Sequence, residues 1–113
     1  MSKFDDCLET YDAAFKKLGQ AVYNPDLLKK VAKGLGPSIY NTDSSKVSSS
    51  DKEELARVKK SFLIKKLGLD DSPALDDAIG EVVTWFGKSN PSKYRAVFYY
   101  KLVEKFDKAS VYN

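Results

Sequence analysis

Apolar residues recur at intervals of three or four along most of this chain, which is the period of an amphipathic α-helix. The first such segment runs from about Phe4 to Leu18. The second is short: Asn24 is placed to cap it, Pro25 suits its first position, and Gly34 lies just past its end. Both segments are predicted to be helices with one buried face.

A third and a fourth helix are predicted after a long interval. The third opens with the capping-box spacing Ser50-Asp51-Lys52-Glu53 and closes at Gly68. Its apolar residues form two stripes, which predicts contact with two neighbouring elements. The fourth runs from Ser72-Pro73 to Phe86, and its acidic polar side is typical of a surface helix.

The fifth predicted helix is apolar over more than half of its circumference. It starts near Asn90-Pro91 and continues to about Asp107. A helix with so broad an apolar face is usually surrounded by the rest of the fold. No useful stretch alternates with a period of two, so no strand is predicted. We therefore expect an all-α fold, a compact single-domain bundle of about five helices with the fifth at its centre.

Residues 34–50 do not follow the helical period. They contain Gly36-Pro37 and end in a run of serines. Loops of this length without regular structure tend to be either functional or disordered. Because Ile39, Tyr40 and Val47 offer apolar anchors, we expect a long, ordered, Ser-rich loop.

Composition is consistent with one soluble domain spanning residues 1–113. Of these residues, 42% are hydrophobic and 31% are charged, as in ordinary globular proteins. The single cysteine, Cys7, cannot form an internal disulfide, which favours a reducing compartment. No apolar run approaches the roughly 20 residues that span a bilayer, and the acidic N-terminal stretch lacks a signal core. We expect a cytoplasmic protein with no membrane contact.

The net charge of +3 invites a nucleic-acid interpretation, but the placement of the charges argues against it. Acidic residues gather in the first turns of the predicted helices and lysines in the last turns. The helix dipole favours this arrangement without any partner. Weak nucleic-acid binding through lysines stays open as a third alternative.

Catalytic signals are scarce. The chain has no histidine and one cysteine, so the commonest general base and the usual zinc ligands are missing. No glycine-rich phosphate loop is present. We therefore expect no metal, no cofactor and no enzymatic activity, although a small enzyme using carboxylate or tyrosine chemistry is an open alternative.

Arg95 has two interpretations. It projects near the middle of the fifth helix's apolar face, where a cation must be paired. The structural interpretation is an internal salt bridge or bonds to loop carbonyls. The functional interpretation is an anion or carboxylate site, to which arginine contributes a planar fork of donors.

A candidate ligand site combines Arg95 with the Ser-rich loop. Hydroxyls precede the N-terminus of the third helix, where free amides attract anions. The predicted ligand-binding residues are Tyr40, Ser44, Ser45, Ser50 and Arg95. The competing interpretation is that these hydroxyls bond the backbone of their own loop.

The chain also resembles a known family, the bacterial domain-of-unknown-function family 2853. The resemblance covers nearly the whole chain and lies in LLKKVAKGLGPSIYN, DSSKVSSSDKEELARVKKSFLIKKLGL and KYRAVFYYKLVEKF. It implies a bacterial cytoplasmic protein of one domain and supplies no activity, cofactor or substrate. The leading hypothesis is thus a non-catalytic binding or protein-interaction module. Its expected partners are a second copy of the chain, another protein or a small anion.

Overall fold

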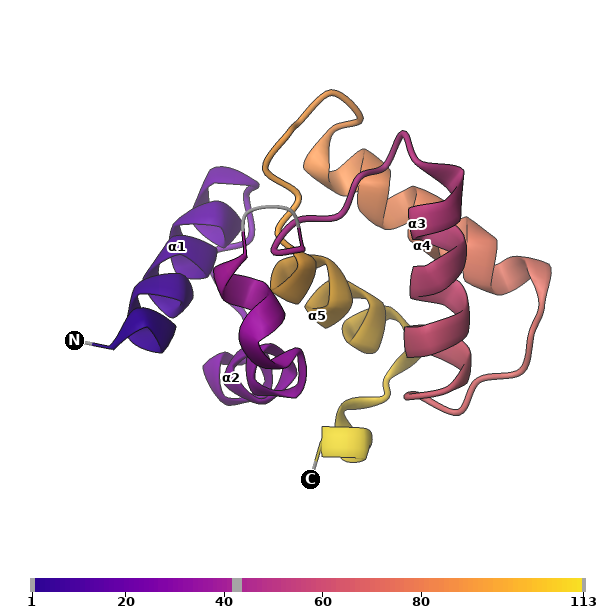
Figure 1. Ribbon diagram of the computed structural model, residues 1–113, viewed down its shortest axis with the longest axis horizontal. Helices are drawn as coiled ribbons and strands as arrows, with labels where there is room; N and C mark the ends of the chain where they lie inside the picture. The colour runs from indigo at the N-terminus through magenta and orange to yellow at the C-terminus, as the bar shows by residue number, and fades with distance from the viewer. Residues whose placement is uncertain (1, 42–43, 113) are drawn as a thin grey trace.

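The most apolar helix, α5 (Arg95–Phe106), runs through the middle of the molecule. In Figure 1 it lies between α1 (Lys3–Lys17) and α2 (Pro25–Gly34) on one side and α3 (Lys52–Arg57) and α4 (Pro73–Phe86) on the other. Seven of its 12 residues are buried. The prediction that the fifth helix is surrounded by the others is confirmed.

This computed structural model describes residues 2–41 and 44–112. Within these ranges no strand forms, and the β-type pairing consists of one isolated bridge between Lys46 and Tyr94. The radius of gyration is 13.1 Å, close to the roughly 13 Å expected for a folded chain of this length. The all-α, single-domain prediction is confirmed.

Aromatic rings fill the space between α5 and its neighbours. Phe98 of α5 is completely buried and stacks on Phe86 of α4, with ring centroids 5.9 Å apart. On the other side, the buried Phe15 of α1 meets Tyr100 edge-on at 5.2 Å. Burying a side chain of this size stabilises the fold by about 1.5–3 kcal/mol. These contacts explain why α5 is central.

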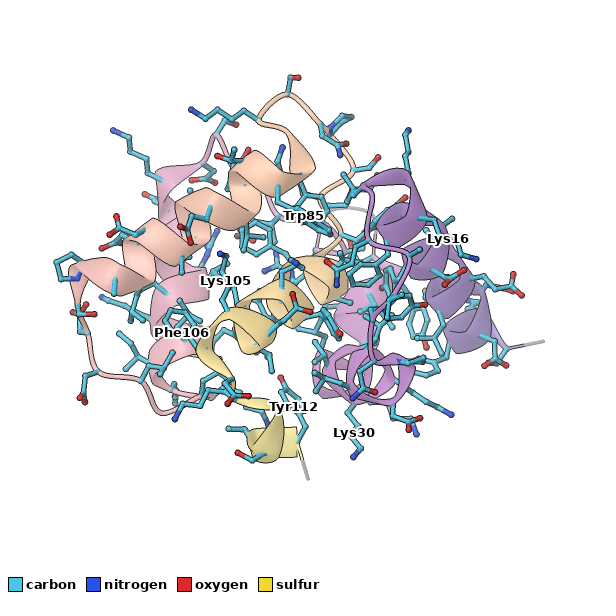
Figure 2. The ribbon with its side chains drawn as sticks, turned by 180° about the vertical axis from the view of Figure 1, so that it is seen from behind. Lys16, Lys30, Trp85, Lys105, Phe106 and Tyr112 are labelled. Atoms are coloured by element: carbon cyan, nitrogen blue, oxygen red, sulfur yellow. The ribbon has the colours of Figure 1, made fainter. Side chains whose placement is uncertain are left out.

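The outer side of α4 joins α5 through polar contacts. Lys105 donates to the Glu81 carboxylate at 2.8 Å, and the Lys101 ammonium lies 4.6 Å from the centroid of a Trp85 ring. Trp85 and Lys105 appear on the same face of the molecule in Figure 2. The short 3₁₀ segment η3 (Ala109–Tyr112) then packs against α2.

The third helix differs from its prediction at its start and in its second half. Asp51 is its N-cap, and the Asp51 carboxylate accepts from two backbone amides, so the capping box starting at Ser50 is wrong. From Val58 to Ile64 the helix widens into the π-helical segment η2. Backbone bonds then span five residues, as from Leu67 N to the Phe62 carbonyl at 2.9 Å.

The fifth helix begins at Arg95, later than the predicted start near Asn90-Pro91. The Asn90 side chain holds a turn instead, because its amide donates to the Phe86 carbonyl and its oxygen accepts from the Ser92 amide. Tyr94 is then extended in the bridge to Lys46, which delays the first helical residue.

The Ser-rich loop contains more structure than its sequence predicts. Its first part forms the 3₁₀ segment η1 (Gly36–Tyr40), and residues 42 and 43 lie outside the described residues. Ile39 and Val47 are buried, as predicted for anchors. Tyr40 is 47% exposed, so its expected role as a third anchor is wrong.

Candidate functional site

The guanidinium of Arg95 is engaged by three separate parts of the protein. Its Nε donates to the Ser44 carbonyl at 2.7 Å, and Nη2 donates to the Lys46 carbonyl at 3.3 Å. Nη1 donates to the Tyr99 hydroxyl at 3.1 Å. Nη2 also donates to the Glu54 carboxylate in a salt bridge. Four of the five N–H donors of the guanidinium are thereby used.

The pair of Arg95 and Glu54 is shielded from solvent, since the two side chains are 15% and 12% exposed. Burial opposes the charge of Arg95, but Tyr99 and Glu54 outweigh it and hold the pKa of Arg95 above its usual value. The second Glu54 oxygen accepts from Arg57 at 2.9 Å, and Arg57 is 66% exposed. Arg95 is therefore a charged internal lock that joins α5, α3 and the loop.

Backbone bonds fix the same loop against the start of α5. The Arg95 amide donates to the Ser45 carbonyl at 2.7 Å, and the Val47 amide donates to the Lys93 carbonyl at 2.8 Å. These bonds flank the bridge between Lys46 and Tyr94. The serines that follow Val47 are consequently held in place beside the turn that precedes α5.

A polar cavity of about 350 Å³ opens between these serines and that turn. Serine hydroxyls and lysines dominate its wall, and none of the described residues that line it is acidic. The serines and lysines of the lining are Lys46, Ser48, Ser49, Ser50, Lys88, Ser89 and Lys93. Lys46, Lys88 and Lys93 all contribute positive charge to this wall, and the Lys46 ammonium also lies 5.6 Å from the centroid of the Tyr94 ring.

Lys93 is the unusual member of this wall, because the residue is only 3% exposed. Its ammonium donates to the backbone carbonyls of Lys88 at 3.0 Å and Asn90 at 2.5 Å. Among the described residues, no carboxylate pairs with it. Burial therefore lowers the pKa of Lys93. An ammonium has three donors, so one N–H remains after the two carbonyls.

The structure brings together three of the five residues predicted to bind a ligand. Ser44 and Ser45 contact Arg95 through their backbone carbonyls, and the Ser44 hydroxyl donates to the Ser38 carbonyl at 2.8 Å. Ser50 instead lines the polar cavity, to which Arg95 does not contribute. Tyr40 is an exposed residue of η1. The ligand-binding role of this set stays a prediction, while the bonds of Arg95 are those expected for an internal lock.

The expected free amides at the start of the third helix are also occupied. The Asp51 carboxylate accepts from the amides of Glu53 at 2.9 Å and Glu54 at 3.3 Å. An anion in the cavity would therefore depend on side chains more than on this helix terminus.

Four residues that matter here were not singled out from the sequence: Glu54, Lys88, Lys93 and Tyr99. Tyr99 had a usable signal, because it follows Arg95 by four residues and so lies on the same helical face. No sequence signal linked Glu54 to Arg95, because 41 residues separate the two. The burial of Lys93 depends on a turn that the sequence pattern assigned to a helix.

The described residues contain no cluster of acidic, cysteine or histidine side chains that could hold a metal. Over the same residues, none of the helices has the length and apolar character required to cross a membrane. The chain belongs to DUF2853, a family of proteins of unknown function, whose model matches residues 10–110. No curated protein matches the chain.

Proposed function

We propose that this member of DUF2853 is a small non-catalytic binding module, and that its polar cavity holds a small oxyanion such as phosphate or a phosphate ester. The observation that carries the proposal is Lys93, a buried cation in the wall of the cavity; within residues 2–41 and 44–112 it has no carboxylate partner, and no acidic residue lines the cavity. An oxyanion there would receive the remaining ammonium N–H and the hydroxyls of the neighbouring serines.

Electrostatics favour this ligand over a neutral one. Burying a cation is costly unless it is compensated, and backbone carbonyls compensate Lys93 only in part. Of the described acids close to the cavity lining in sequence, Asp51 caps α3, whose terminal amides offset its charge, and Glu54 pairs with Arg95. A bound oxyanion therefore meets positive charge with little opposing negative charge.

The non-catalytic part of the proposal rests on the chemistry of the cavity wall. In the described part of the chain its polar groups are serine hydroxyls, lysines and one amide, without a carboxylate or histidine to move a proton, and the Lys93 ammonium is bonded to two carbonyls rather than to a serine hydroxyl. A bacterial cytoplasmic location suits the single cysteine. A protein-interaction role has less support, because the exposed large apolar side chains among the described residues, Val22 and Tyr40, are isolated and make no extended patch.

The test is isothermal titration calorimetry with inorganic phosphate and pyrophosphate at low and physiological salt. We expect both to bind the wild type, with weaker binding as salt rises. Lys93→Met should reduce the affinity by about tenfold or more, since it removes a charge-assisted hydrogen bond. Lys88→Met provides a second test on an exposed residue whose replacement does not threaten folding.

Lys29→Met is the matched control, because Lys29 is an exposed lysine on α2 away from the cavity lining. Its affinity for pyrophosphate should equal that of the wild type. The proposal is wrong if the wild type binds neither anion at millimolar concentration. It is also wrong if Lys29→Met and the two cavity variants weaken binding equally, because that would indicate non-specific attraction to lysines.

A further inference from the structure

A second cavity, of about 490 Å³, lies between α1 and the turn that follows α4. Its volume falls in the range of roughly 300–1,000 Å³ that is usual for small-molecule sites. Unlike the polar cavity, it has a mainly apolar wall. The apolar lining residues are Ala13, Ala14, Leu18, Phe86 and Tyr94.

Small side chains on one wall and large rings on the other account for this space. Ala13 and Ala14 reach only a short distance from α1, which leaves a gap opposite Phe86 and Tyr94. Each of these two rings packs against another aromatic ring. Phe86 stacks on Phe98, and Tyr94 packs against Tyr11 with ring centroids 5.7 Å apart. The apolar wall is therefore preformed, as in most small-molecule sites.

The charged group in this wall is a lysine. Lys17 lines the cavity, and none of the other described lining residues is charged. The adjacent Lys16 is paired with Asp12 at 2.9 Å, whereas Lys17 has no such ion pair among the described residues. The polar remainder of the lining consists of Thr10, Asn90 and Ser92, which are neutral. The cavity thus combines an apolar surface with one cationic group.

We infer that this cavity binds a small amphipathic monoanion, a molecule with an aliphatic or aromatic body and a single carboxylate or sulfonate. The apolar body lies between the two alanines and the rings of Phe86 and Tyr94. The acidic group faces Lys17. Asn90 lines both this cavity and the polar cavity, but the two sites use different lysines, and this one requires apolar surface.

Octanoate, with 1-octanol as its uncharged counterpart, tests the inference by displacing the fluorescent sulfonate 1-anilinonaphthalene-8-sulfonate. We expect the wild type to enhance the fluorescence of the sulfonate and octanoate to reverse the enhancement. Ala13→Leu fills the cavity from an exposed position where leucine suits the helix. It should lower the affinity for octanoate and for the fluorescent sulfonate by about tenfold. Circular dichroism verifies that the variant is folded.

The charge is tested separately. Lys17→Gln should lower the affinity for octanoate by about threefold to fivefold, the range expected for a partly exposed ion pair. The affinity for 1-octanol should not change. Lys16→Gln is the matched control and should affect neither ligand. Lys93→Met should also leave octanoate binding unchanged, which separates this site from the oxyanion cavity. The inference is overturned if the wild type binds neither octanoate nor the sulfonate, if Ala13→Leu leaves binding intact, or if Lys17→Gln weakens the acid and the alcohol equally.

Discussion

Replacing Arg95 by methionine removes the lock between α5, α3 and the Ser-rich loop. Methionine keeps an unbranched apolar stem in the same space but donates no hydrogen bond. The Glu54 carboxylate, which is 12% exposed, then loses its buried partner. The carbonyls of Ser44 and Lys46 lose their donors as well.

The size of the effect follows from these losses. Removing one member of a buried ion pair destabilises a protein by about 3–5 kcal/mol, because the remaining charge is uncompensated. Arg57 still reaches Glu54 at 2.9 Å from the exposed side, which places Arg95→Met toward the lower end of that range. A domain of this size loses roughly 4 °C in melting temperature per kcal/mol, so we expect a decrease of about 12 °C or more.

Thermal and urea unfolding, followed through the fluorescence of Trp85, measures this difference. Arg57→Met is a well-matched control, because it removes the other partner of the same carboxylate at an exposed position. Exposed pairs contribute about 0–1 kcal/mol, so its melting temperature should fall by only a few degrees. Glu54→Leu combined with Arg95→Met should recover part of the loss by removing the stranded charge. Equal, small effects of Arg95→Met and Arg57→Met would refute the reasoning.

Two further predictions concern alkaline pH and the cap of α3. Burial raises the pKa of Tyr23 and Tyr112 from 10.0 to about 12, so their stabilisation is complete below about pH 10 and is lost as the pH rises toward 12. The free energy of unfolding should therefore fall between about pH 10 and 11, by up to about 1.4 kcal/mol per pH unit for each tyrosine. Urea midpoints should fall with it, and a constant midpoint over this range would contradict the assignment. Asp51→Ala should lower the free energy of unfolding by about 1 kcal/mol, whereas Ser50→Ala should leave it nearly unchanged. If urea unfolding shows the larger loss for Ser50→Ala, then Ser50 caps the helix, as the sequence predicted.

The fold was predictable because local signals and burial agree along most of the chain. Pro25 is the first residue of α2 as predicted, and the broad apolar face of α5 correctly predicts its central place. Gly34 is the last residue of α2, one position earlier than the predicted place just past its end. The start of α5 was not predictable in this way. Its position depends on the Asn90 turn and on the bridge between Lys46 and Tyr94, which joins residues far apart in the sequence.

The candidate site was less predictable for a related reason. Sequence indicates that Arg95 needs a partner, but only the packing of α3 against α5 identifies Glu54. The polar cavity depends on the burial of Lys93, which in the sequence looks like one more surface lysine among the 17 lysines that accompany two arginines. Periodicity identifies apolar faces well, whereas the burial of a charge depends on how distant loops meet.

Arg95 and Lys93 lie two residues apart, and their different partners assign them different roles. Arg95 has a carboxylate, so its charge is satisfied inside the fold. Lys93 has two carbonyls and no carboxylate among the described residues, which is why we propose that an external anion completes its environment. The lock also holds the loop whose serines form the opposite wall of the cavity. Loss of Arg95 should therefore weaken phosphate binding indirectly and together with stability, whereas loss of Lys93 should weaken binding directly with a smaller loss of stability, since it leaves two carbonyls without a donor but no buried charge without a partner. A variant of Lys93 that unfolds as readily as Arg95→Met would show that both cations serve only the fold.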